Sequence, residues 1–418
     1  MAKGLANLTQ EVSAEEPVEL PLRTESVAAV YYVDSEAELV GAVENLKTGT
    51  GPLAIDAERA SGFRYGNTAY LIQLHRENTD IFLIDPIDLS KSPAWSTLAE
   101  FSNGLTWILH AATQDLGCLA EVGLKPAALI DTEHGSRLLN LPRVGLGAAC
   151  EQLLGFRLAK EHSAADWSVR PLPNSWLNYA ALDVDVLPAL AKVLMEQLEQ
   201  ANKGHLAEQE FKHLLGFEPK PQSPDRWRSM TGLHDVKDVQ KLAIARELWF
   251  ARDALAQDRD TAPGRLVSDS SIVALVKSGI SSKSELSSLK TFTGRASRSF
   301  LDVWWEAYAK GRATKDTPAL KLVSTGIPNH RNWPSRYPEA DARLQALKPV
   351  MAELALEFEV PLENLLQPDL LRRVAWEPEE DIAKQLLAMG ARQWQVDAVA
   401  SPISSALEKL SQETRPVS

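Results

Sequence analysis

The chain has 418 residues and a formal net charge of −12 at pH 7, with 44% hydrophobic and 24% charged residues. This length exceeds one ordinary hydrophobic core, so we expect several domains of globular composition. No apolar run is long enough for a transmembrane helix, and the N-terminus lacks the apolar centre of a secretory signal. The only cysteines, Cys118 and Cys150, argue against a disulfide framework or structural zinc and favour a reducing cytoplasm.

After a polar tail over residues 1–27, the first half of the chain alternates between strand and helix patterns. Short apolar or β-branched runs predict strands over residues 28–33, 53–55, 69–74, 80–84, 106–109 and 127–130. Capped amphipathic runs predict helices over residues 35–45, 92–101, 146–154 and 174–200, with others that begin near residue 113 and end near residue 141. An antiparallel meander followed by β/α units predicts an α/β fold, with a mixed sheet flanked by helices over residues 28–206.

Beyond a proline-containing segment at residues 219–224, the chain predicts only helices. One helical unit is expected over residues 225–312 and another over residues 339–408, with residues 313–338 as a linker. From Arg226 to Arg312, 15 Lys and Arg residues face 10 Asp and Glu residues, a local balance of +5. This local charge fits contact with a polyanion, although the basic residues could equally form a solvated face.

Two acid triplets follow predicted strands. Asp56 and Glu58 are two residues apart in an extended segment, so both side chains point to one face, a geometry suited to a shared metal ion. Asp131 and Glu133 repeat this spacing, but Asp131 is better explained as the cap of the following helix, with Glu133 in the first turn. Alone, either triplet is most simply a solvated strand end or a cap.

Further acids come from segments that predict helices. Asp115 lies just after the strand at residues 106–109, where an acid in a first helical turn is common. Tyr179 and Asp183 are four residues apart and share a helix face, so the tyrosine hydroxyl could orient a water beside a metal-binding carboxylate. Asp185 lies about 200° around the same helix from Asp183, so it cannot face the same site.

The order and spacing of these segments resemble the tyrosine-containing branch of the DEDD exonuclease superfamily, and ribonuclease D in particular. The motifs are residues 55–58, 110–116 and 179–183, supported by residues 70–74 and 166–172. The resemblance implies an RNase H-like exonuclease domain that removes nucleotides from RNA 3′ ends, including tRNA precursors, with two Mg²⁺ or Mn²⁺ ions.

The roles of individual residues follow from the same resemblance. Asp56 would bridge both ions, Glu58 and Asp183 would complete the nucleophile-side ion, and Asp115 would support the other. Tyr179 would position the attacking water. Substrate-binding roles are expected for a further group: Gln73, His110, Lys160, Trp167 and Arg170. Trp176 departs from the pattern, because related sequences often carry glutamine there, and this affects substrate contact or packing rather than metal binding.

The helical half resembles HRDC domains, which are nucleic-acid-binding modules. Residues 263–269 and 289–295 carry the resemblance in the first unit, and residues 361–368 and 390–395 suggest a second, divergent copy. We expect Trp304, Trp305 and Trp394 to be core residues rather than base-stacking platforms.

Three functions remain open at this level: an exoribonuclease, a DNA exonuclease, and a non-catalytic RNA-binding protein with a decayed nuclease domain. The acids cannot separate RNA from DNA, whereas the presence of all four disfavours the third. The spacing around Gly145 and Gly147 does not support a dinucleotide loop, because a third glycine and a preceding strand are missing. We expect a monomer, with the arrangement of the helical units undetermined.

Overall fold

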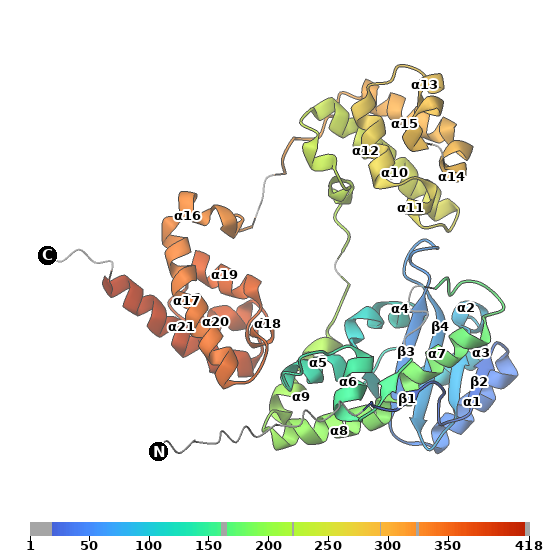
Figure 1. The fold of residues 1–418 in the computed structure, drawn as a ribbon, viewed down its shortest axis with the longest axis vertical. Helices are drawn as coiled ribbons and strands as arrows, with labels where there is room; N and C mark the ends of the chain where they lie inside the picture. The colour runs from blue at the N-terminus through green and yellow to red at the C-terminus, as the bar shows by residue number, and fades with distance from the viewer. Residues whose placement is uncertain (1–18, 160–164, 220, 293, 323–325, 414–418) are drawn as a thin grey trace, which may run out of the picture.

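The computed structural model describes residues 19–159, 165–219, 221–292, 294–322 and 326–413. It contains a sheet-bearing unit followed by two helical units (Figure 1). The expected fold class, a mixed α/β domain with an all-helical C-terminal half, is confirmed. Within the described residues, no helix is both long and apolar enough to cross a membrane.

The main sheet has six strands in the order β2-β5-β4-β3-β6-β7. Its central strands β3, β4 and β5 form the expected antiparallel meander, while β2 joins β5, and β6 and β7 extend from β3, in parallel. The strands are β1 Leu22–Arg23, β2 Val30–Val33, β3 Thr50–Arg59, β4 Ala69–Glu77, β5 Ile81–Ile84, β6 Thr106–Leu109, β7 Ala128–Asp131 and β8 Arg157–Leu158.

Helices cover both faces of this sheet. In β3, Leu53 and Ile55 belong to the same buried cluster as residues of α1 and α3, whereas Ala54 belongs to the cluster that contains residues of α7 and α8. This alternation sends Asp56 and Glu58 toward α7, which crosses one face of the sheet (Figure 1). The helices of this unit are α1 Glu36–Thr48, α2 Pro86–Leu89, α3 Pro93–Asn103, α4 Leu116–Glu121, α5 Thr132–Leu138, α6 Leu146–Leu153, α7 Asn174–Asp185, α8 Leu187–Gln200 and α9 Gly204–Leu215.

Three details differ from the sequence-based expectation. The helix expected over residues 174–200 is two helices that meet at Val186, because Pro188 cannot donate a backbone hydrogen bond and starts the second helix. The expected N-terminal tail includes β1, which pairs with β8 and so belongs to the sheet-bearing unit. That unit also continues past Leu206, because α9 buries Phe211 and Leu214 in its core.

The first helical unit has a separate buried core centred on Trp227, Trp304 and Tyr308. Trp304 is fully buried and Trp305 stacks on Tyr308 with ring centroids 5.8 Å apart, which confirms the core-packing prediction for this pair. The helices of this unit are α10 Val239–Asp258, α11 Pro263–Leu266, α12 Asp269–Ser278, α13 Lys283–Ser288, α14 Arg295–Ser299 and α15 Leu301–Ala313.

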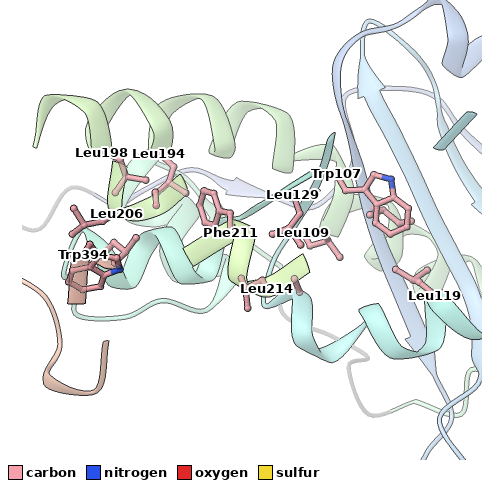
Figure 2. Packing of buried hydrophobic residues seen from close by; sticks show 14 of the residues in the cluster. Trp107, Leu109, Leu119, Leu129, Leu194, Leu198, Leu206, Phe211, Leu214 and Trp394 are labelled. Carbon is pink, nitrogen blue, oxygen red and sulfur yellow. The ribbon is translucent and has the colours of Figure 1, made fainter. Parts of the chain in front are cut away.

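The second helical unit shares one continuous core with the sheet-bearing unit. Figure 2 shows Trp394 beside Leu206, a residue of α9. Trp394 is buried, as predicted, and donates from Nε1 to Glu210 of α9 at 2.8 Å. Trp333, which falls in the expected linker, is fully buried in this core. The helices are α16 Trp333–Arg336, α17 Pro338–Glu357, α18 Leu362–Leu365, α19 Pro368–Trp376, α20 Ile382–Ala388 and α21 Gln393–Glu413.

Candidate active site

The site forms where β3 faces α7. Asp56 and Glu58 lie within β3 rather than at its end, and they pair in register with Gln73 and Leu71 of β4. The opposite side chains of β3 are apolar and lie in the core, so this register holds both carboxylates toward α7. The sequence predicted the shared face of the two acids but underestimated the length of the strand.

Helix α7 brings a third carboxylate to this face. Oxygen atoms of Asp56, Glu58 and Asp183 all lie within 4.8 Å of one another. Three hard oxygen ligands that converge from two rigid elements match the preference of divalent cations such as Mg²⁺ and Mn²⁺. The donor set therefore suits a divalent metal ion.

The fourth predicted acid, Asp115, is held next to this group by a loop. It is the N-cap residue of α4 and is 5% exposed; after burial and the charges of Asp56 and Asp183, its charge also raises the pKa of Glu58. The loop before it is fixed by Asp131, which accepts backbone hydrogen bonds from Ala111 at 3.1 Å and Ala112 at 2.8 Å. Asp131 is thus outside the acid group but sets the path of the chain that leads to Asp115.

Arg59 is a charged neighbour that the sequence analysis missed. Its Nη2 lies 3.4 Å from Oδ1 of Asp115, and its Nη1 donates to the carbonyl of Gln114 at 2.9 Å. Strict alternation along β3 would direct Arg59 away from Glu58. The register shifts between these two residues, however, and this irregularity brings the guanidinium to the acids. The sequence signal that could have identified Arg59 is a basic residue directly after the Asp-x-Glu triplet.

Burial disfavours the charged form of all four carboxylates, and repulsion from neighbouring acids adds to this effect at Glu58, Asp115 and Asp183. Burial raises the pKa of Asp56 to about 6, and burial followed by the charges of Asp56, Asp183 and Asp115 raises the pKa of Glu58 to about 10. Burial and then the charge of Asp56 raise the pKa of Asp115 and Asp183 well above the ordinary range. Bound cations would relieve this repulsion, so the electrostatics favour metal binding.

Tyr179 lies one turn before Asp183 and makes a side-chain hydrogen bond with it. Burial, followed by the charge of Asp183, raises the pKa of the Tyr179 phenol, so the hydroxyl keeps its proton. Trp167 packs beside Tyr179 with ring centroids 6.4 Å apart, and Trp176 packs on Trp167 at 5.3 Å. The departure at Trp176 therefore contributes to packing behind the tyrosine.

The residues expected to contact substrate have varied environments. Gln73 and Trp167 are fully buried, so in this conformation they can act on substrate only through their neighbours. Nδ1 of His110 lies 2.9 Å from Oγ1 of Thr132. Arg170 forms an ion pair with Asp85 at 2.5 Å and donates to the carbonyl of Trp167 at 2.8 Å, which fixes the segment before α7. Lys160 lies outside the described residues.

The acids expected to lie outside the site do so. Oδ1 of Asp131 also accepts from the backbone nitrogens of Glu133 at 2.9 Å and His134 at 3.0 Å, which is the predicted helix cap. Asp185 accepts from Arg23 at 3.3 Å and from the backbone of Val27 at 3.2 Å, and so anchors the N-terminal segment. Both carboxylates are satisfied by structural contacts.

Comparison with protein families divides the chain into the same three parts. Residues 30–199 match a 3′-5′ exonuclease family, residues 241–308 match the HRDC domain, and residues 326–407 match a family described as a 3′ to 5′ exonuclease C-terminal domain. The unit that resembled a second HRDC copy therefore matches a different family from the HRDC domain.

Curated relatives include several ribonucleases D. The chain is 31% identical to ribonuclease D of Psychromonas ingrahamii over 50% of this chain and 57% of that protein. It is 30% identical to ribonuclease D of Cronobacter turicensis over 57% of this chain and 64% of that protein. The exosome complex exonuclease RRP6 of Saccharomyces cerevisiae is 26% identical, over 62% of this chain and 37% of that protein. The chain thus spans less than two thirds of the length of these relatives.

Solved structures extend the likeness to nearly the whole chain. A protein from Bifidobacterium adolescentis is 36% identical with a TM-score of 0.87, over 93% of this chain and 100% of that one. RNase D of Escherichia coli, described as an exoribonuclease involved in structured RNA processing, is 23% identical with a TM-score of 0.64, over 91% and 99% of the two chains. The latter likeness supports the fold.

Proposed function

We propose that this chain, a member of the ribonuclease D family, is a 3′→5′ exoribonuclease. Its 3′-5′ exonuclease domain precedes an HRDC domain. The convergence of oxygen atoms from Asp56, Glu58 and Asp183 within 4.8 Å carries this proposal. Asp115 and Tyr179 stand beside these acids, so every residue type that the hydrolysis requires is present. The alternative of a decayed nuclease domain would require a missing acid.

Metal binding is assigned to the four acids, with Mg²⁺ or Mn²⁺ as the ions. Asp56 would contact both ions, Glu58 and Asp183 would hold the one on the nucleophile side, and Asp115 would hold the other. When bound, two such ions activate the attacking water and stabilise the leaving oxygen. The carboxylates of this chain would hold the ions in place because β3 and α7 are rigid elements that pack on a buried core.

The tyrosine has a positioning role toward water. Its hydroxyl forms a hydrogen bond with Asp183 and keeps its proton. It can therefore hold a water next to the metal-binding acids without acting as a base. Trp167 restricts the ring from behind. The orientation of the phenol is therefore determined by packing before substrate arrives.

RNA is the proposed substrate class, with structured RNA 3′ ends such as those of tRNA precursors as the natural form. The names of the ribonuclease D relatives support RNA over DNA, since the acids themselves do not discriminate. The E. coli relative is described as acting in structured RNA processing, and we propose the same for this chain. We also propose a monomeric, cytoplasmic enzyme.

The test follows hydrolysis of a 5′-labelled RNA hairpin with a single-stranded 3′ extension, in Mg²⁺ and separately in Mn²⁺. We expect stepwise shortening from the 3′ end and release of nucleoside 5′-monophosphates. Asp56→Asn should abolish it, whereas Asp185→Asn, two residues from a catalytic acid but turned away from it, should retain it. A matched DNA strand should be a poorer substrate. Full activity of Asp56→Asn would refute the assigned site, and preference for DNA would establish the alternative substrate.

A further inference from the structure

The loop that joins β3 to β4, residues 60–68, leaves the catalytic strand and reaches the first helical unit. Figure 1 shows this loop extending from β3 and β4 toward α10 and α11. It begins at the residue after Arg59, so its conformation is directly connected to the strand that carries Asp56 and Glu58. A contact made by this loop therefore constrains a segment that is continuous with the catalytic strand.

The tip of the loop makes backbone and side-chain contacts with α11 and with the turn that precedes it. The backbone nitrogen of Ala262 donates to the carbonyl of Phe63 at 2.9 Å. Nε of Arg265 donates to the carbonyl of Gly62 at 2.8 Å, and its guanidinium lies 3.9 Å from the centre of the Phe63 ring. These contacts satisfy backbone groups of both partners, as expected for a defined docking geometry rather than a chance approach.

Asp260 supplies a second set of contacts to the same loop. Its Oδ1 accepts from the backbone nitrogen of Tyr65 at 3.2 Å, and its Oδ2 pairs with Arg64 at 3.4 Å. The Tyr65 hydroxyl donates to Asp253 of α10 at 3.3 Å, and the Tyr65 ring packs against the core of the first helical unit. Asp260 has a positive φ of 43°, an uncommon conformation for a non-glycine residue that directs its carboxylate at the loop.

The loop also contacts the segment that leads into α7. Nε of Arg64 donates to Oγ of Ser168 at 2.8 Å, and Ser168 in turn donates to Asp166 at 2.6 Å. Trp167 lies between these two residues and packs beside Tyr179. Arg64 therefore links Asp260 to the segment that leads into α7, and the chain itself joins Arg64 to β3.

We infer that residues 60–68 form a docking loop that fixes the first helical unit beside the catalytic acids. The inference rests on the proposed function and deepens it. An RNA strand long enough to contact both units binds more tightly when their geometry is fixed, because its second contact is then intramolecular. A dinucleotide contacts only the catalytic acids, so the docked unit does not change its affinity. The docking loop thus makes activity depend on substrate length, and Arg64 and Asp260 are positioning residues.

The decisive variant is Asp260→Gly, because glycine accepts the positive φ while losing both side-chain contacts. Asp258→Ala is the matched control: it removes the same charge two residues away, where the carboxylate pairs only with the neighbouring Arg259 among the described ion pairs. Removing an acid should by itself strengthen binding to RNA. A loss of activity in Asp260→Gly therefore cannot come from net charge.

The experiment compares kcat and KM for a 12-nucleotide RNA and for a diribonucleotide, together with the radius of gyration in solution. We expect Asp260→Gly to lower kcat/KM for the longer RNA about tenfold, mainly through KM, and to leave the diribonucleotide within about twofold. The same variant and Phe63→Ala should expand the protein, and Asp258→Ala should resemble the wild type. Equal losses on both substrates, or no expansion, would overturn the docking role. If the wild type hydrolysed neither RNA, the proposed function and the length dependence would both fail, and the expansion would still decide whether the loop docks the unit.

Discussion

Replacing Glu210 by glutamine tests how the second helical unit is held on the sheet-bearing unit. Glu210 is 1% exposed, and its Oε1 accepts from Arg392 at 2.7 Å and from Trp394 at 2.8 Å. Its Oε2 lies 3.2 Å from Nε2 of His134 on α5. One buried carboxylate thus joins α9, α5 and the start of α21, and its loss leaves the largely buried Arg392 side chain, 10% exposed, without its charge partner.

The magnitude follows from these contacts. Removing one member of a buried ion pair costs about 3–5 kcal/mol, because the remaining charge stays desolvated. Glutamine keeps the volume and one acceptor oxygen, which can still bind the Trp394 indole, so we expect the lower end, about 3 kcal/mol. Urea unfolding at pH 7, followed by tryptophan fluorescence, measures this change. Glu208→Gln, at an exposed position on the same helix, is the control and should change stability by less than about 0.5 kcal/mol.

The pH dependence supplies an independent check. Burial raises the pKa of Glu210, but hydrogen bonds from His134 and Arg392 outweigh it and hold the pKa below the ordinary glutamate value. A carboxylate with a depressed pKa stabilises the fold above its unfolded-state pKa, and this contribution disappears as pH falls through the folded-state pKa. The wild type and Glu210→Gln should therefore converge in stability as the pH falls below the ordinary glutamate range. A loss below about 1 kcal/mol at pH 7, or a difference that persists in acid, would refute this explanation.

Further predictions concern the site itself. Asp131→Asn should slow RNA hydrolysis by at least about tenfold in steady-state assays, because an amide cannot accept all the backbone hydrogen bonds that shape the loop before Asp115; an unchanged rate would show that this loop holds its shape alone. Tyr179→Phe should lower kcat by about 10²-fold while Mn²⁺ affinity, measured by calorimetry, stays unchanged, since the phenol orients water rather than metal; a parallel loss of Mn²⁺ binding would contradict that role. In EDTA, the raised pKa of Glu58 predicts that the melting temperature falls as pH rises from the ordinary glutamate range toward about 10, because the folded state keeps a proton that the unfolded state has lost. Glu58→Gln should flatten this profile. The same profile in both proteins would contradict the electrostatic explanation.

Much of the catalytic unit could be predicted from local patterns. The strand at residues 106–109 and the antiparallel meander follow from apolar runs separated by polar turns, and the structure confirms both. The shared face of Asp56 and Glu58 follows from the two-residue period of a strand, and that of Tyr179 and Asp183 from the helical period. The structure confirms that Asp131 caps α5, and it places Asp185 in contact with the N-terminal segment; capping and helix geometry are also local properties.

Features that depend on distant residues could not be predicted in this way. The approach of Arg59 to Asp115 results from an irregularity in strand pairing that no single-strand pattern encodes. The burial of Gln73 and Trp167 depends on how distant elements pack over the sheet, which the resemblance behind their expected substrate contact does not describe. The attachment of both helical units also involves contacts between residues far apart in the sequence, such as those of Asp260 and Glu210.

The most direct test of the central claim is the anomalous scattering of Mn²⁺ in crystals soaked with the ion. We predict two peaks, one among Asp56, Glu58 and Asp183 and the other between Asp56 and Asp115, with both absent in Asp56→Asn. Two-metal sites place the ions about 3.5–4 Å apart, which sets the expected separation. Mn²⁺ bound elsewhere, for example at Asp131 and Glu133, with none among the four acids, would contradict the assignment of this site as the catalytic centre.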